Sequence, residues 1–103
     1  KVLFTKTTGN TDFAIIDAGM TELIRPALYQ AKHKIVALAK DDSHLQPYHV
    51  VGPICESSDV FAKALMLPSL KRGDFVVIYS AGAYGKVLAS EYNLRPTVQE
   101  YFI

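Results

Sequence analysis

Short β-rich runs separated by turn residues are the feature of this sequence that most limits its fold. Residues 2–8 and 12–17 flank the turn pair Gly9-Asn10, which predicts a β-hairpin. Further runs of β-branched and apolar residues cover 34–39, 49–54 and 75–79. Short strands at regular spacing are typical of a closed or nearly closed sheet, which we therefore expect.

Three segments are not plainly strands. Residues 21–30 predict one short helical turn that ends at Gln30, because Pro26 suits the first turn of a helix. Residues 86–91 are also compatible with a helix. Residues 60–67 fit a helix or a strand, and the proline that follows them favours a strand. The sequence thus predicts a mainly β fold with one or two short helices.

The charge balance and the apolar runs exclude two classes of partner. Eleven Lys and Arg residues against ten Asp and Glu give a net charge of +1, and no long basic block occurs, so we expect no nucleic acid partner. The apolar runs are too short to cross a bilayer, so we expect no membrane partner. The single cysteine, Cys55, excludes a disulfide within the chain and favours the reducing cytoplasm.

The 103 residues predict one domain at most, since a chain of this size builds a single core. The sequence has no initiator Met, and strand-like runs stand at both ends, the second at 98–103. We therefore expect a piece of a longer protein.

Cys55 and Glu56 lie in a turn that follows the strand-like run 49–54. Loops at strand ends often display polar groups for function. A thiol can donate a proton, and a carboxylate can bind a cation. The alternative is that Cys55 is a small buried apolar side chain, and composition alone favours that interpretation.

Arg25, Tyr29 and Tyr84 are the other candidate binding residues. Arg25 and Tyr29 are four residues apart, so they share a face of the predicted helical turn and combine a guanidinium with a phenol. Tyr84 lies between Gly82 and Gly85, which allow close backbone approach to a ligand. Taken singly, these residues favour structural roles: the Arg25 stem packs on the phenol, and the glycines serve a tight turn.

Metal binding is not expected from this sequence. The four residues of the types that zinc prefers do not show the paired spacing of a zinc site: His33, His44, His49 and Cys55. Each histidine is expected to be solvated or structural.

Six sequence elements occur in one order along nearly the whole chain. They are Asp17-Ala18-Gly19-Met20, Arg25-Pro26-Ala27-Leu28-Tyr29, residues 51–59, Gly73-Asp74, residues 81–85 and Tyr92-Asn93-Leu94-Arg95-Pro96. In this combination the chain closely resembles the C-terminal domain of diaminopimelate decarboxylases, which are fold-type III pyridoxal-phosphate-dependent decarboxylases. The cysteine and Gly-Ala-Tyr elements are shared with ornithine and arginine decarboxylases, whereas Glu56 and the Arg25–Tyr29 element point to diaminopimelate.

The resemblance implies a fold and a site. The fold is a Greek-key-like β-barrel or sandwich, like the C-terminal domain of alanine racemase, and it is incomplete without a strand from the enzyme's N-terminus. Cys55 and Glu56 reach the site of the neighbouring subunit, where Cys55 donates the proton that replaces the lost carboxylate of meso-diaminopimelate. Arg25 and Tyr29 hold the end of the substrate that does not react. Tyr84 contacts the substrate and the cofactor, pyridoxal 5′-phosphate.

The resemblance also implies what lies outside this chain. An N-terminal β/α barrel domain holds the cofactor and its Schiff-base lysine, and the intact enzyme is a homodimer that releases L-lysine and CO2. We expect residues 1–103 to be a single C-terminal β-barrel domain that is inactive alone. The alternatives are a domain of a related ornithine- or arginine-type decarboxylase and a non-catalytic β module that binds a protein partner.

Overall fold

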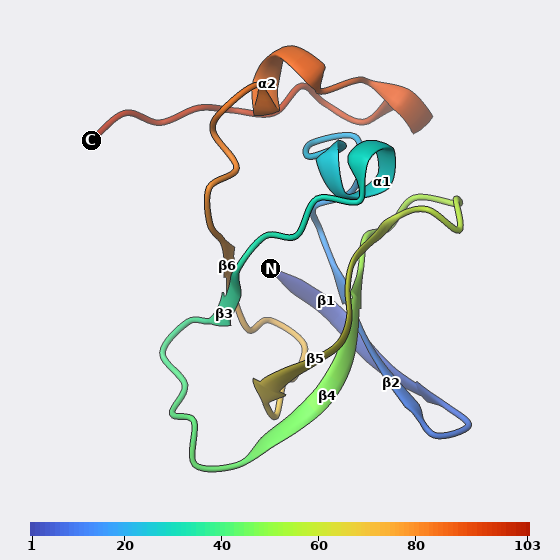
Figure 1. The fold of residues 1–103 in the computed structure, drawn as a ribbon, viewed down its shortest axis with the longest axis vertical. Coiled ribbons are helices and arrows are strands. Elements are labelled where there is room, and N and C mark those ends of the chain that lie inside the picture. Colours follow the sequence, from blue (N-terminus) through green and yellow to red (C-terminus); the bar gives the residue numbers. More distant parts are fainter.

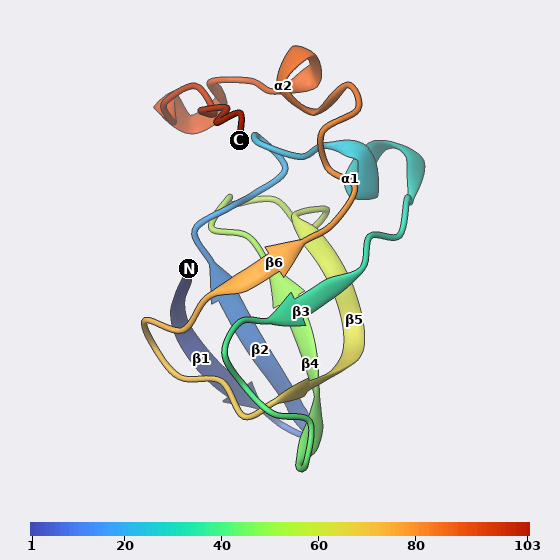
Figure 2. The same ribbon diagram turned by 90° about the vertical axis from the view of Figure 1, so that its left-hand side faces the viewer.

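The computed structural model describes residues 1–103 and consists of two β-sheets with short helices at one end (Figure 1). The larger sheet has the order β1 (Val2–Thr8), β2 (Thr11–Ile16), β4 (Leu45–Val51) and β5 (Val60–Pro68). The smaller sheet pairs β3 (Ile35–Ala37) with β6 (Val76–Ile78). Figure 2 shows the smaller sheet lying across one face of the larger one. The mainly β fold class is confirmed.

Strand pairing follows the turn residues and the length of each connection. β1 and β2 form the predicted antiparallel hairpin, and Gly9 adopts the positive φ of 61° that its turn requires. β2 pairs with β4 in parallel, so the chain must cross over between them. The crossover carries the first helix and β3, and it places the loops that follow β2 and β4 at the same end of the sheet.

The core lies between the two sheets. Its ten buried residues are Val2, Ala14, Ile16, Leu23, Ile35, Tyr48, Val50, Phe61, Leu67 and Leu70. Ala14 and Ile16 of β2 alternate with more exposed neighbours, as expected for a strand with one buried face. The buried phenol of Tyr48 accepts a hydrogen bond of 2.9 Å from the backbone N–H of Leu70, so burial leaves no polar atom of this ring unpaired.

Two expectations about the strands are not met. Both sheets are open, because β3 and β6 pair only with each other and β1 and β5 remain edges. The chain therefore does not form the closed or nearly closed sheet that we expected from the strand spacing. Residues 98–103 form no strand, although their composition predicted one. No neighbouring strand pairs with this segment, and its apolar side chains Tyr101, Phe102 and Ile103 are exposed.

The helices are short, as the sequence predicted. α1 (Arg25–Tyr29) has Pro26 in its first turn and ends at Gln30, which takes the left-handed conformation of a C-cap. α2 (Gly85–Leu88) begins before the predicted range and ends within it, and a 3-10 helix covers Tyr92–Leu94. None of the helices has the length and apolar character needed to cross a membrane.

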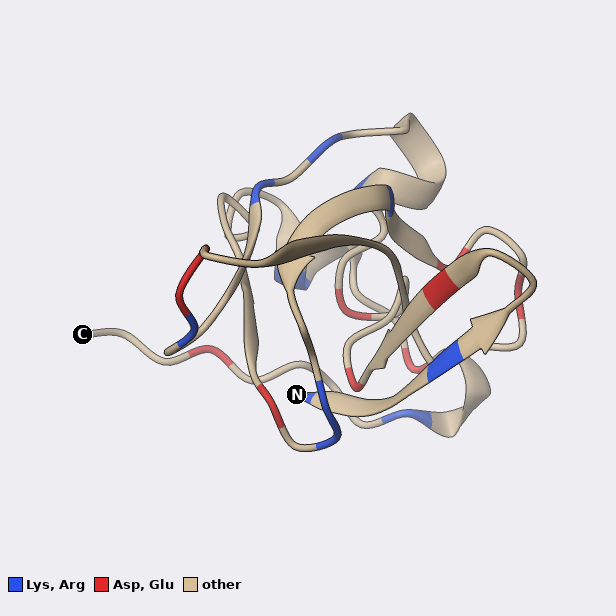
Figure 3. Cartoon of the chain, turned by 90° about the horizontal axis from the view of Figure 1, so that it is seen from below, with Lys and Arg blue, Asp and Glu red and all other residues tan.

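Charged residues are distributed without segregation of sign. In Figure 3, Lys and Arg (blue) are interspersed with Asp and Glu (red) along the chain. This distribution agrees with the net charge of +1.

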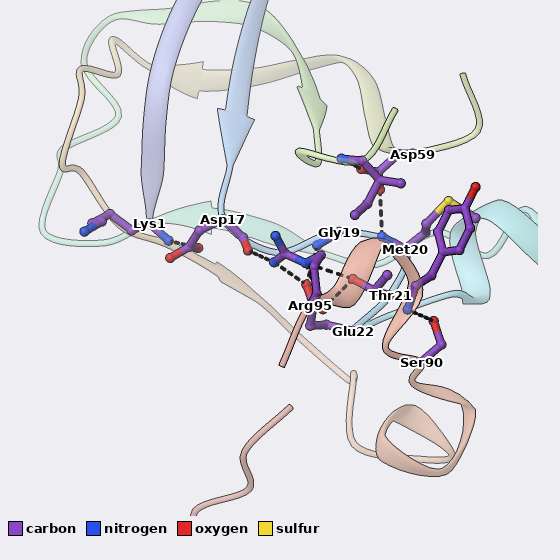
Figure 4. Close-up of polar contacts among 11 residues, drawn as sticks. Lys1, Asp17, Gly19, Met20, Thr21, Glu22, Asp59, Ser90 and Arg95 are labelled. Carbon is purple, nitrogen blue, oxygen red and sulfur yellow. Dashed lines mark hydrogen bonds and ion pairs between the residues drawn. The ribbon is translucent and has the colours of Figure 1, made fainter. Parts of the chain in front are cut away.

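Asp59 connects two loops at the helical end of the molecule (Figure 4). Its side chain is buried, and the backbone N–H groups of Met20 and Ile54 donate hydrogen bonds of 2.6 and 2.8 Å to its two carboxylate oxygens. Burial raises the pKa of Asp59 in spite of these hydrogen bonds. Asp59 therefore fixes the loop after β4 to the turn after β2.

Arg95 fixes the C-terminal segment to the same turn (Figure 4). Its Nη2 donates hydrogen bonds to the backbone oxygen of Asp17 at 2.5 Å and to Glu22 Oε1 at 2.9 Å. Its Nε donates to Thr21 Oγ1 at 3.1 Å. The backbone N–H of Ser90 adds a bond of 2.9 Å to the backbone oxygen of Thr21. The residues around the 3-10 helix are thus held beside the turn that follows β2.

The close contact between Gly52 and Asp59 gives a stability test. A Cβ atom at position 52 would lie 2.6 Å from the Asp59 carboxyl carbon. Gly52→Ala should therefore lower the free energy of unfolding by about 1–3 kcal/mol in urea titrations, as overpacking does. Gly82→Ala is the control, because nothing lies within 4 Å of its Cβ position. Equal effects of the two variants would contradict this role of Gly52.

The ion pair of Glu22 with Arg95 predicts a pH dependence. Burial favours the neutral form of Glu22, but the hydrogen bonds from Arg95, Thr21 and Gly19 outweigh it and lower the pKa of Glu22 below 4.5. A lowered pKa contributes stability that is present above pH 4.5 and is lost as the pH falls through the folded-state pKa.

Glu22→Gln should therefore destabilise the fold by about 1–2 kcal/mol at neutral pH. The difference from the wild type should shrink below the ordinary pKa of glutamate, where both side chains are neutral. Urea unfolding at a series of pH values from 7 to about 3 measures this change. A difference that does not depend on pH would show that the charge of Glu22 is not what stabilises the segment.

Candidate functional site

The candidate residues lie on three elements at one end of the molecule. Figures 1 and 2 both place α1, α2 and the loop between β4 and β5 at the end where β2 finishes. The strands set this arrangement. Because β2 and β4 are parallel, the loops that follow them begin at the same end of the sheet.

The loop after β4 presents Cys55 and Glu56 to solvent. Ile54 and Asp59 are buried at its two ends, whereas the four residues between them are exposed. The Asp59 hydrogen bonds fix this shape, because they hold the loop at Ile54 and at the neighbouring turn. The interpretation of Cys55 as a small buried apolar side chain is therefore wrong.

An exposed thiol beside an exposed carboxylate can serve as a proton donor and a cation ligand for a molecule bound outside this chain. No hydrogen bond within the chain occupies the thiol of Cys55. Glu56 accepts one hydrogen bond, from the phenol of Tyr92, at 2.5 Å between the two oxygens. That bond is the main reason that the pKa of Tyr92 is raised.

Arg25 and Tyr29 stand at the two ends of α1. Tyr29 is 63% exposed, and Arg25 is partly exposed. Neither side chain forms a hydrogen bond within the chain, so the guanidinium and the phenol keep their donors for an external group. A carboxylate is the group that such a pair of donors suits best.

Tyr84 precedes α2 in an unusual backbone conformation. Its φ of 61° and ψ of 4° are left-handed, a conformation that costs energy in any residue with a side chain. Tyr84 is 73% exposed, and no other part of the chain lies within 4 Å of the Cβ positions of the flanking Gly82 and Gly85. The phenol therefore projects from an open turn, where it can contact a ligand.

The candidate residues share one end of the molecule but are not in mutual contact. A groove of about 540 Å³ lies between α1 and the segment that leads into β5, lined by Pro26, Ala27 and Gln30 on one side and Val60 and Phe61 on the other. No hydrogen bond or ion pair joins Arg25, Tyr29 or Tyr84 to the pair formed by Cys55 and Glu56. Within one chain they form separate groups.

Tyr92 and Arg95 are the site residues that the sequence analysis did not single out. Both belong to the element Tyr92-Asn93-Leu94-Arg95-Pro96, which supported the resemblance to the family but predicted no role for either residue. Pairing of a C-terminal phenol with Glu56, 36 positions earlier, depends on the tertiary fold and has no local signal. No group of three or more His, Cys, Asp and Glu side chains is arranged to hold a metal.

Comparisons with known proteins agree with this fold. Diaminopimelate decarboxylase of Bacteroides thetaiotaomicron is 54% identical over 101 residues, which cover 98% of this chain and 26% of the relative. The crystal structure of diaminopimelate decarboxylase from Helicobacter pylori, complexed with L-lysine, matches with a TM-score of 0.87 at 48% identity, over 94% of this chain and 24% of that one. Lysine decarboxylase from Selenomonas ruminantium matches with a TM-score of 0.81 at 28% identity, over 92% of this chain and 26% of that one.

The chain thus spans about a quarter of the length of these relatives. The sheet-domain fold implied by the resemblance is confirmed by the solved structures, with both sheets open in this chain. A family model described as the C-terminal sheet domain of pyridoxal-dependent decarboxylases matches residues 1–82. The chain therefore belongs to the pyridoxal-dependent decarboxylases, as their C-terminal sheet domain.

Proposed function

We propose that this chain supplies substrate-binding and proton-donating residues to a decarboxylase that converts meso-2,6-diaminopimelate to L-lysine and CO2. One observation carries the proposal: in a chain 54% identical to a diaminopimelate decarboxylase, Cys55 and Glu56 are exposed side by side on a loop that buried contacts fix. Such a loop can reach into a site on another domain or subunit. Residues 1–103 act as one C-terminal domain, and the chain alone is inactive.

Cys55 is the proposed proton donor. Bound pyridoxal phosphate serves as an electron sink when the carboxylate leaves as CO2. The α-carbon then needs a proton in place of the carboxylate, and the exposed thiol can deliver one. The thiolate that remains recovers its proton from solvent.

The end of the substrate that does not react is bound, in this proposal, by Glu56, Arg25 and Tyr29. Meso-diaminopimelate carries an ammonium and a carboxylate at that end. The Glu56 carboxylate suits the ammonium, and the free donors of Arg25 and Tyr29 suit the carboxylate. A substrate without the second carboxylate would leave these donors unpaired, which disfavours its binding.

Tyr84 is the residue of this chain that fits contact with the cofactor. Its exposed phenol projects from an open turn between two glycines, so the ring can lie against a planar group and the hydroxyl can donate a hydrogen bond. The glycine-rich loop that binds the phosphate, and the Schiff-base lysine, belong to the N-terminal β/α barrel domain in this proposal. That barrel and a second copy of the enzyme are the proposed partners, in the cytoplasm.

A related decarboxylase for another basic amino acid is the second candidate, because the lysine decarboxylase from Selenomonas ruminantium shares this fold. A substrate panel on the intact protein distinguishes the two. The kcat/KM for meso-diaminopimelate should exceed the values for lysine, ornithine and arginine by at least about 1,000-fold, because the site pairs both charges of the second amino-acid group. Preference for any of the other three amino acids would overturn the proposed substrate.

The role of Cys55 is tested by Cys55→Ala in the intact enzyme. Loss of a positioned proton donor should lower kcat by about 100-fold or more and change KM little. Ser69→Ala is the matched control, because it removes a small exposed polar group beyond the far end of β5. Steady-state assays of CO2 release measure kcat and KM for both variants. Unchanged turnover in Cys55→Ala would remove the thiol from the mechanism.

A further inference from the structure

We propose that Tyr92 is a positioning residue that holds the Glu56 carboxylate in the orientation that binds the substrate ammonium. The inference rests on the proposed function, because it gives Glu56 the role described there. It adds a residue that does not touch the substrate and that acts through Glu56.

The geometry of the pair leaves one carboxylate oxygen free. The phenol of Tyr92 donates its hydrogen bond to Glu56 Oε1 at 2.5 Å, and this is the one hydrogen bond that the Glu56 side chain makes. Oε2 has no partner within the chain. A carboxylate held in this way by one oxygen presents the other to a cation.

Positioning matters at Glu56 because the side chain is exposed on a loop. A free glutamate loses rotamer entropy when it binds a ligand, and this loss weakens binding. The hydrogen bond from Tyr92 restricts the Glu56 side chain before the substrate arrives, so less entropy is lost on binding.

Both partners of the hydrogen bond are fixed to the same turn. The Asp59 carboxylate joins the loop of Glu56 to Met20. The Arg95 guanidinium joins the segment of Tyr92 to Glu22 and Thr21. The hydrogen bond between Tyr92 and Glu56 closes this circuit, which spans three segments that are far apart in the sequence. Figure 4 shows the contacts of Asp59 and Arg95 with the shared turn. A surface contact of two free side chains would have no such support.

The negative charge of Glu56 beside Tyr92 favours a phenol that keeps its proton and donates a hydrogen bond. The Glu56 carboxylate raises the pKa of Tyr92, since an ionised phenol would lie next to a negative charge. Tyr92 therefore stays protonated at neutral pH and keeps donating to Glu56.

The kinetic test is a double-mutant cycle in the intact enzyme. Tyr92→Phe removes only the hydroxyl and should raise the KM for meso-diaminopimelate about 10-fold with kcat within about 2-fold. Glu56→Gln should raise KM by at least as much. Adding Tyr92→Phe to Glu56→Gln should change KM by less than about 2-fold, because Tyr92 acts through the carboxylate.

Tyr79→Phe is the matched control, because its hydroxyl makes no hydrogen bond and lies just beyond β6. It should leave both kinetic constants unchanged. If Tyr92→Phe has no effect while Glu56→Gln raises KM, the inference is overturned and the proposed function stands. The inference is also overturned if Tyr92→Phe has equal effects with and without the Glu56 carboxylate. If Glu56→Gln leaves KM unchanged, the substrate-binding role of Glu56 falls, and the inference falls with it.

A second measurement does not depend on activity. The enzyme labelled with 13Cζ-tyrosine reports the titration of each phenol by NMR, and the signal lost in Tyr92→Phe identifies Tyr92. Glu56→Gln should shift the Tyr92 titration to lower pH, because the carboxylate that raises the pKa of Tyr92 is gone. An unchanged titration would show that the two side chains are not in contact and would overturn the inference even in an enzyme with another substrate.

Discussion

The buried carboxylate of Asp59 is the interaction on which the candidate site depends. It accepts backbone hydrogen bonds from the turn after β2 and from the loop after β4, two segments that the parallel pairing of β2 with β4 brings to one edge of the sheet. Without these hydrogen bonds the exposed residues between Ile54 and Asp59 would have no fixed direction. Asp59 forms no ion pair, so burying its carboxylate is costly, and the backbone hydrogen bonds that it accepts offset part of that cost.

Arg95 gives the same turn a second attachment. Its guanidinium binds Glu22 and the backbone of Asp17, and it brings Tyr92 beside Glu56. The small core between two open sheets does not determine where these loops lie. Polar contacts determine their positions, and the exposed candidate residues at this end are held by the buried Asp59 and the half-buried Arg95 behind them.

Local patterns predicted the parts of the fold that local chemistry determines. The hairpin at Gly9 and the helical turn at Pro26 follow from residues that favour those conformations, and the strand assignment of 60–67 is confirmed. The closed sheet and the strand at 98–103 could not be judged in this way, because each depends on which strands find partners. Exposure of Cys55 likewise depends on contacts made by Asp59, four residues away.

The resemblance identified the candidate residues in the sequence, whereas the fold supplied the pairing of Glu56 with Tyr92. The most direct test is a crystal structure of the intact enzyme with meso-diaminopimelate or L-lysine bound. We expect Glu56 of one subunit to contact the ligand ammonium in the neighbouring site, with Tyr92 on its other oxygen and Cys55 facing the reacting carbon. A structure in which the loop of Cys55 and Glu56 points to bulk solvent, away from any bound ligand, would contradict this prediction.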